Sequence, residues 1–441
     1  MEVIILAGGL GTRLAPVLPE IPKCLAPVGE QKRPSALTEA VASTVGEQKR
    51  SSVLTERPFL GWMLEWLKGY RVDHVVFSVG HLWEQVITYV KSLELPFTCD
   101  FAVEETPLGT GGGIRKALEL CHEERVYVLN GDTFYPVALS DMPSEAAITL
   151  ALKPMKDFDR YGAVSVKASD SPTAEENCFS GRYPKNQFSS AIATPSHADA
   201  LQVTAFHEKC LCAEGLINGG VYALNRSRLD LGSLPEKFSF EKDVLELLAD
   251  KGKLGGWVSN ADFIDIGIPE DYARAQWFIP AWFRCKNASE NLLSAKADYL
   301  FLDRDGVINR LRPGDYVKTW DEWEWMPGVL QEFPKWATKF ERIVLVTNQR
   351  GVGRGVMTMD ALYGIHERML SEVAAAGGRM DRILVCTAVS DEDPRRKPNT
   401  GMFKEAVEAF PEISAERSIM LGDSDSDERF ALNCGMQFVR Y

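Results

Sequence analysis

Two aspartates one residue apart follow an apolar run in the second half of the chain, and their types and spacing suit chemistry on a phosphate group. Leu300 to Leu302 predict a buried parallel strand that ends at Asp303, with Asp305 directly beyond it. Open α/β sheets place their reactive groups at the carboxyl ends of parallel strands. Two carboxylates there can hold a divalent cation, and one of them can attack a phosphorus atom.

Further polar residues end apolar runs downstream. Thr347 to Gln349 follow the run Ile343–Val346, Lys397 stands in an Arg-Lys-Pro triplet, and Asp423 ends another apolar run. We expect them at the same sheet edge as Asp303. A carboxylate that attacks a phosphomonoester dianion is repelled by it, so Mg²⁺ and a nearby cation such as Lys397 must offset the repulsion. One aspartate pair alone is more often a solvated turn, but four motifs in order favour a site.

A second candidate site opens the chain. The apolar run Val3–Ala7 leads into Gly8-Gly9-Leu10-Gly11-Thr12-Arg13-Leu14. A glycine-rich turn after a strand exposes successive backbone amides that can cradle a phosphate. Arg13 and Lys23 add the cations that a triphosphate needs. Alone the loop is a weak signal, but it predicts a nucleotide site because the pattern continues downstream.

Length and composition limit the number of domains, the partners and the cellular compartment of this protein. A chain of 441 residues predicts two or three domains. Its net charge of −13 argues against nucleic acid or an anionic membrane as the main partner. The nine cysteines are scattered, the chain opens without a signal-like segment, and no apolar run approaches membrane length. We therefore expect a cytoplasmic protein.

The glycine-rich site near the start of the chain resembles that of a known family. Gly8 to Leu14 with Pro22-Lys23 is similar to the signature of the sugar-1-phosphate nucleotidyltransferases, over roughly residues 1–280. The resemblance implies a Rossmann-like, glycosyltransferase-A-like α/β domain that joins a nucleoside triphosphate to a sugar 1-phosphate and releases pyrophosphate. It implies Mg²⁺ held by Asp132 and Asp265, which with Arg13 and Lys23 would neutralise the phosphates and align the attack.

The same resemblance assigns the binding residues of the first domain. One group, at the first strand end, the glycine-rich loop and a loop against the nucleobase, would bind the nucleotide: Leu6, Ala7, Gly8, Gly9, Gly11, Thr12, Arg13, Gly109, Thr110 and Gly111. A second group would contact the sugar phosphate: Glu208, Lys209, Asn218 and Gly219.

Two stretches depart from this family. Val28–Glu39 recurs as Val45–Glu56 with two substitutions, which indicates a local tandem duplication inserted at about 28–56. Residues 169–200, rich in Ser, Pro, Asn and Ala, predict an extended hairpin loop or a disordered excursion.

The boundary between the two domains is expected after a helical pattern that begins at Pro269. We expect Pro280 to interrupt this helix, residues 281–296 to form a linker, and residues 297–441 to form the second domain.

The four motifs of the second domain resemble those of haloacid dehalogenase-superfamily phosphatases. The resemblance implies another Rossmann-like α/β domain, with Asp303 as the nucleophile that forms an aspartyl-phosphate and Asp305 as the acid/base. Thr347 and Lys397 would bind the phosphoryl oxygens. Asp423 would complete a Mg²⁺ site with Asp303 and the carbonyl of Asp305, and Asp427, one turn on, would support that site.

The form of these motifs is similar to the D-glycero-D-manno-heptose 1,7-bisphosphate phosphatase branch, whose neighbour is histidinol-phosphate phosphatase. This resemblance implies substrate contacts from Asn348, Gln349, Arg354 and Arg396. Members of this branch often carry a Cys/His zinc loop before the Arg-Lys-Pro motif. Here Cys386–Pro394 holds one cysteine and no histidine, so we predict no zinc.

Together the resemblances predict a bifunctional enzyme. It would remove the 7-phosphate of heptose 1,7-bisphosphate and transfer a nucleotidyl group, GMP from GTP, to the heptose 1-phosphate, giving GDP-heptose for surface polysaccharide. Two alternatives stay open: a mannose-1-phosphate guanylyltransferase fused to a histidinol-type phosphatase, and a chain in which one domain is a catalytically silent sensor or scaffold. The oligomeric state also stays open, a homo-oligomer included.

Overall fold

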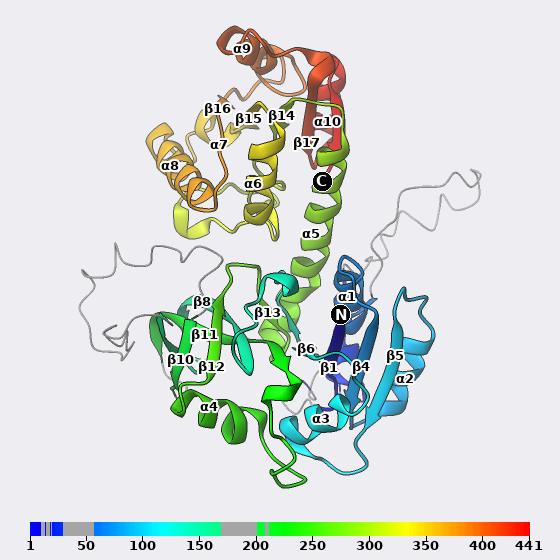
Figure 1. Cartoon of the computed structure of the whole chain (residues 1–441). Coiled ribbons are helices and arrows are strands. Elements are labelled where there is room, and N and C mark those ends of the chain that lie inside the picture. Colours follow the sequence, from blue (N-terminus) through cyan, green and yellow to red (C-terminus); the bar gives the residue numbers. More distant parts are fainter. Residues whose placement is uncertain (10–13, 15–17, 19, 30–56, 169–200, 208–210) are drawn as a thin grey trace. The chain divides into compact units, whose positions relative to one another are not determined.

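The computed structural model describes the chain except residues 10–13, 15–17, 19, 30–56, 169–200 and 208–210. The predicted excursion 169–200 and nearly all of the insertion 28–56 therefore lie outside the described residues. The chain divides into two compact units, Met1–Gln276 and Trp277–Tyr441 (Figure 1). Each unit is an α/β structure, and the predicted fold class is confirmed.

The first unit is built on a mixed sheet whose described strands run in the order β5-β4-β1-β6-β11-β8-β12-β10-β9. Val3, Ile4 and Ile5 of its strand β1 are fully buried, as expected of a parallel strand covered on both faces. The strands are β1 (Glu2–Leu6), β4 (His74–Val79), β5 (Thr98–Val103), β6 (Arg125–Asn130), β8 (Ile148–Phe158), β9 (Val164–Ala168), β10 (Leu201–Phe206), β11 (Cys212–Asn225) and β12 (Leu254–Val258).

Helices and four two-residue strands complete the first unit. The helices are α1 (Phe59–Leu67), α2 (Trp83–Lys91), α3 (Gly109–Leu118), α4 (Glu246–Asp250), η1 (Lys23–Leu25), η2 (Leu139–Asp141), η3 (Arg226–Arg228) and η4 (Glu241–Leu245). The short strands are β2 (Pro27–Val28), β3 (Arg57–Pro58), β7 (Thr133–Phe134) and β13 (Ile264–Asp265). Because β2 pairs with β3, Val28 and Arg57, on either side of the undescribed residues 30–56, lie side by side. Because β13 pairs with β7, Asp265 lies opposite Thr133.

The second unit has a five-stranded parallel sheet in the order β16-β15-β14-β17-β18. Alternate residues of the central strand enter two separate cores: Leu300 and Leu302 pack in one, and Tyr299 and Phe301 in the other. The strands are β14 (Tyr299–Leu302), β15 (Arg342–Asn348), β16 (Arg382–Cys386), β17 (Ser418–Gly422) and β18 (Gln437–Arg440). The helices are η5 (Trp320–Glu322), α6 (Val329–Lys339), α7 (Arg350–Gly353), α8 (Met359–Ala375), α9 (Gly401–Ala409), η6 (Ala415–Arg417) and α10 (Asp425–Cys434).

The predicted interruption at Pro280 is wrong, because α5 (Pro269–Ser294) is one continuous helix with this proline inside it (Figure 1). Residues 281–294, most of the predicted linker 281–296, are therefore helical. An internal proline costs a helix about 3 kcal/mol. Burial of an apolar stripe offsets that cost, since the stripe packs into the core of the second unit: Ala281, Cys285, Ala288 and Leu292.

Among the helices of the described residues, none combines the length and the apolar character that a membrane-spanning segment requires.

Candidate active sites

The site of the second unit is centred on Lys397, which lies between two carboxylates. Its Nζ is 2.7 Å from Oδ1 of Asp303 and 2.6 Å from Oδ1 of Asp427. Asp303 directly follows β14, whereas Asp427 lies in the first turn of α10. The other oxygen of Asp427 accepts hydrogen bonds from the backbone and hydroxyl of Ser424, which form a capping box. Helix capping therefore fixes the carboxylate that holds the lysine.

Asp303, Asp423 and Asp427 form the one cluster in the described residues with the geometry of a metal site, with ligand atoms within 4.8 Å of one another. Burial, together with the charge of Asp427, raises the pKa of Asp303 to about 8 and that of Asp423 to about 6, against the opposing effect of Lys397. The two carboxylates beside Lys397 raise its pKa in spite of its burial. One ammonium does not balance three carboxylates, so the cluster fits a hard divalent cation such as Mg²⁺.

A glycine lets the two ends of this cluster approach. Gly306 has φ +91°, and a Cβ atom there would lie 2.1 Å from Oδ2 of Asp423. Only glycine permits both this backbone conformation and this contact. Parallel pairing of β14 with β17 brings Asp303 and Asp423 to the same edge, as the sequence predicts.

Asp305 lies outside the carboxylate cluster, because other side chains hold its carboxylate. Oδ1 accepts hydrogen bonds from Arg304 at 2.8 Å and Asn309 at 2.9 Å, and Oδ2 accepts one from Gln349 at 2.7 Å. Burial would raise the pKa of Asp305, but the charge of Arg304 and these hydrogen bonds lower it overall. Asp305 is thus held as a carboxylate, the form that accepts a proton. The metal ligand predicted from this residue is its carbonyl oxygen.

Arg304 is a feature that the sequence analysis missed. It is fully buried, and its guanidinium also lies 3.4 Å from Nε2 of His366. Burial and the Arg304 charge lower the pKa of His366 to about 3, so the histidine is neutral at physiological pH. In the sequence, the role of Arg304 is indicated only by its position between Asp303 and Asp305.

The amides after β15 link two of the predicted motifs. The Asn348 side chain makes two hydrogen bonds of 3.1 Å with the Lys397 backbone: its Nδ2 donates to the carbonyl, and its Oδ1 accepts from the N–H. Gln349 also donates to Oγ1 of Thr347 at 2.8 Å. Predicted substrate-contacting residues therefore position Lys397, Asp305 and Thr347 as well. Arg354 donates to the hydroxyl of Tyr316 at 3.4 Å.

The site of the first unit also has a lysine between two carboxylates. Lys23 Nζ lies 2.5 Å from Oδ2 of Asp132 and 3.6 Å from Oδ1 of Asp265. The pairing of β7 with β13 brings these predicted metal ligands together. Leu6, the last residue of β1, accepts a hydrogen bond from the backbone of Gly131 at 3.0 Å, so the glycine-rich loop starts beside Asp132. Two carboxylates at a strand edge fit Mg²⁺.

A cavity of about 330 Å³ adjoins this group. Its wall includes the predicted Asn218 and Gly219, where the pairing of β11 with β8 shifts register. Gly220 has φ +72°, and a Cβ there would lie 2.6 Å from Nδ2 of Asn130. Sequence reasoning missed several polar or aromatic residues of the wall: Asn130, Arg160, Tyr161, Tyr222, Glu241, Phe263 and Asp271.

The predicted nucleobase loop forms the start of α3. Thr110 accepts a hydrogen bond from the backbone of Phe240 at 2.9 Å and donates to Glu241 at 3.2 Å. A Cβ on Gly111 would lie 2.1 Å from the Phe238 ring. The glycines allow this close packing, and contact of Gly109 to Gly111 with a nucleobase stays a prediction.

The structure covers only part of the predicted nucleotide and sugar sites. Leu6, Ala7, Gly8 and Gly9 are described, and a Cβ on Gly8 would lie 3.2 Å from a carboxylate oxygen of Glu104. The predicted residues outside the described part of the chain are Gly11, Thr12, Arg13, Glu208 and Lys209.

Comparison with known proteins defines the class of each unit. Residues 2–281 match the Nucleotidyl transferase family model, and residues 300–440 match the model described as Polynucleotide kinase 3 phosphatase. The chain belongs to the nucleotidyl transferase family through its first unit, and it continues into a phosphatase domain. Both domains are enzymatic, so the alternative of a silent domain is not supported.

Two curated relatives make the resemblance more specific, and one solved structure is reported beside them. A D-glycero-alpha-D-manno-heptose 1-phosphate guanylyltransferase of Aneurinibacillus thermoaerophilus is 37% identical over 281 residues, which are 63% of this chain and 97% of the relative. A D-glycero-alpha-D-manno-heptose-1,7-bisphosphate 7-phosphatase of Mycobacterium bovis is 40% identical over 135 residues, which are 30% of this chain and 71% of the relative. A solved D,D-heptose 1,7-bisphosphate phosphatase of B. bronchiseptica, complexed with magnesium and phosphate, is 32% identical with a TM-score of 0.31, and the match covers 32% of this chain and 78% of that one.

Proposed function

We propose that this chain carries out two consecutive steps of heptose activation. The second unit removes the 7-phosphate of D-glycero-D-manno-heptose 1,7-bisphosphate, and the first unit transfers GMP from GTP to the heptose 1-phosphate. The observation that carries the proposal is that the 1,7-bisphosphate named for one relative becomes, on loss of its 7-phosphate, the heptose 1-phosphate named for the other. GDP-heptose for a surface polysaccharide would be the product.

In the phosphatase step, Asp303 attacks the 7-phosphorus and the bond from phosphorus to the sugar oxygen breaks. Lys397 and Thr347 bind the phosphoryl oxygens. When the phosphate binds, its charge raises the pKa of Asp305, which takes up a proton from solvent. Asp305 then gives this proton to the leaving oxygen. Asp305 then takes a proton from water, which hydrolyses the aspartyl-phosphate and restores Asp303. Mg²⁺ held by Asp303, Asp423 and the carbonyl of Asp305 would neutralise charge on the phosphate.

In the transferase step, the heptose 1-phosphate oxygen attacks the α-phosphorus of GTP and pyrophosphate leaves. No protein nucleophile is needed. Lys23, with Arg13, neutralises the phosphates, and Asp132 and Asp265 would hold Mg²⁺ against them. The cavity beside Asn218 and Gly219 is the proposed sugar site.

The test is to incubate purified protein with heptose 1,7-bisphosphate, GTP and Mg²⁺ and to measure phosphate, pyrophosphate and the nucleotide sugar. We expect equal amounts of phosphate and GDP-heptose at completion. Absence of both products contradicts the proposal. Parallel reactions with both heptose anomers, with each nucleoside triphosphate, and with mannose 1-phosphate and histidinol phosphate separate the proposal from the alternative enzyme pair.

A further inference from the structure

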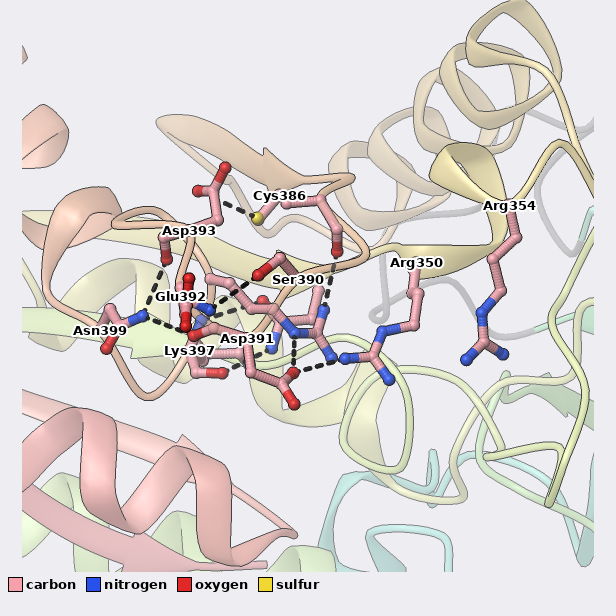
Figure 2. A network of polar contacts seen from close by, with 12 residues as sticks. Arg350, Arg354, Cys386, Ser390, Asp391, Glu392, Asp393, Lys397 and Asn399 are labelled. Atoms are coloured by element: carbon pink, nitrogen blue, oxygen red, sulfur yellow. Dashed lines mark hydrogen bonds and ion pairs between the residues drawn. The ribbon is translucent and has the colours of Figure 1, made fainter.

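Two arginines beside the phosphatase site share one carboxylate. Arg350 and Arg396 both donate to Oδ1 of Asp391, Arg396 through Nε at 2.8 Å. Figure 2 shows the Arg350 side chain extending to Asp391, with Arg354 leaving the same part of the ribbon. Arg350 and Asp391 are 41 positions apart: Arg350 is the first residue of α7, whereas Asp391 lies in the segment between β16 and α9.

The arginine pair adjoins both catalytic aspartates. Arg350 follows Gln349, which donates to Asp305. Arg396 precedes Lys397, which pairs with Asp303. Arg350 and Arg396 are therefore each next in sequence to a residue that contacts a catalytic aspartate, Asp305 or Asp303.

The loop that carries Asp391 is held by its own hydrogen bonds. Asn399 Nδ2 donates to the backbone carbonyls of Asp391, at 3.0 Å, and Asp393, at 2.8 Å, and the Glu392 backbone donates to Oγ of Ser390 at 3.2 Å. Cys386 Sγ lies 3.9 Å from Oδ1 of Asp393 (Figure 2). Here polar contacts give Asp391 a defined position.

Charge and exposure favour a ligand site over a purely stabilising contact. Asp391 is 80% exposed, whereas Arg396 is 13% exposed and Arg350 25%. An exposed ion pair contributes little to stability. The Arg350, Arg396 and Asp391 side chains together carry one positive charge, with Glu392 and Asp393 next to Asp391 in the chain, and the planar fork of arginine matches phosphate oxygens. Arg396 is further fixed by its hydrogen bond to the Ala388 carbonyl at 3.3 Å.

We propose that Arg350, which Asp391 holds beside Arg396, recognises the second phosphate of a sugar bisphosphate and makes the phosphatase prefer bisphosphates to monophosphates. This inference rests on the proposed phosphatase function. It adds Arg350 as a specificity-determining residue and Asp391 as a positioning residue, and neither was expected from the sequence.

The test compares steady-state kinetics on heptose 1,7-bisphosphate and on p-nitrophenyl phosphate, which has no second phosphate. For Arg350→Gln we expect the KM for the bisphosphate to rise about 10-fold or more, with kcat and the monophosphate reaction unchanged, because a contact to a remote phosphate is made equally in the ground and transition states. Arg395→Gln is the matched control, since Arg395 pairs with Glu405 outside this network. It should leave both substrates unchanged.

For Asp391→Asn we expect about a 3-fold rise in the same KM, because the guanidiniums lose the carboxylate that aligns them. Asp391→Glu should recover part of the loss. Equal losses on both substrates, no loss for Arg350→Gln, or a lower KM for Asp391→Asn would overturn the inference. If the unmodified protein hydrolyses p-nitrophenyl phosphate but not the heptose bisphosphate, the proposed function fails instead.

Discussion

Both units place a lysine between two carboxylates at the edge of a sheet, but they bury this group to different degrees. In the first unit, the side chains of Lys23, Asp132 and Asp265 are 12%, 35% and 20% exposed. In the second, those of Lys397, Asp303 and Asp427 are 1%, 12% and 0% exposed.

The difference follows from the two chemistries. The second unit uses one of its own carboxylates as nucleophile, and a fixed, desolvated cation beside that carboxylate lowers the barrier by a larger electrostatic effect. The first unit joins two substrates and needs no protein nucleophile. Its charged group must admit a triphosphate and a sugar phosphate and then release pyrophosphate, which requires an open site.

The largest expected effect comes from the nucleophile itself. Asp303→Asn should lower phosphatase kcat by a factor of about 10⁴ or more, because the amide cannot form the aspartyl-phosphate. The transferase should keep its full rate on heptose 1-phosphate and GTP. Phosphate release and GDP-heptose formation are measured separately on the same preparation. A residual phosphatase rate near that of the unmodified protein would remove Asp303 from its role.

The corresponding change in the open site should be milder. Lys23→Met should lower transferase kcat about 100-fold, since one electrostatic contact to the phosphates is lost while other cations remain. The phosphatase rate should not change. Lys91→Met, on α2, is the control for loss of one positive charge. A loss no larger than that of the control would show that Lys23 is only a structural partner of Asp132.

Burial should make the second group more important for stability. Asp427→Asn breaks one of the two ion pairs of buried Lys397 and should lower the free energy of unfolding of the second unit by about 3 kcal/mol. Asp425→Asn, on the same helix but 79% exposed, should change it by less than about 0.5 kcal/mol. Denaturant unfolding of the full chain measures both. Equal effects would contradict the comparison.

The raised pKa values predict how Mg²⁺ binding depends on pH. Metal-free Asp423 and Asp303 have pKa values of about 6 and about 8, above the usual 3.8. Their contribution to stability is fully present below about pH 4 and is lost as pH rises through 6 to 8. Mg²⁺ binding needs ionised carboxylates and releases protons. The affinity for Mg²⁺ should therefore rise about 100-fold from pH 6 to pH 8 if both carboxylates must be ionised, which calorimetry in buffers of different ionisation enthalpy measures. A pH-independent affinity would contradict this account.

The sequence predicted the residues that end long parallel strands, because strand ends meet at one sheet edge. Asp303, Thr347 and Asp423 were found in this way. Asp265 and Asp132 meet through two strands of two residues each, which leave no pattern, and their pairing was available only from a resemblance. These cases show that residues at strand ends can be predicted when the strands are apolar runs of four residues or more.

Other features could not be predicted, because tertiary contacts decide them. Pro280 was read as a helix break, but the buried stripe from Ala281 onward keeps the helix intact. The central role of Asp427 combines helix capping with an ion pair to a residue 30 positions away. The Arg350–Asp391 pair joins the first residue of the four-residue helix α7 to the segment after β16, and neither stretch has a periodicity that would reveal a partner.

The central claim is that phosphatase chemistry at Asp303 comes before nucleotidyl transfer in the first unit. It is tested most directly by giving the Asp303→Asn protein GTP, Mg²⁺ and either heptose 1,7-bisphosphate or heptose 1-phosphate, and measuring nucleotide sugar by mass spectrometry. The account predicts GDP-heptose from the monophosphate at the rate of the unmodified protein, and no nucleotide sugar from the bisphosphate. Formation of a GDP-heptose 7-phosphate from the bisphosphate at a comparable rate would contradict that order.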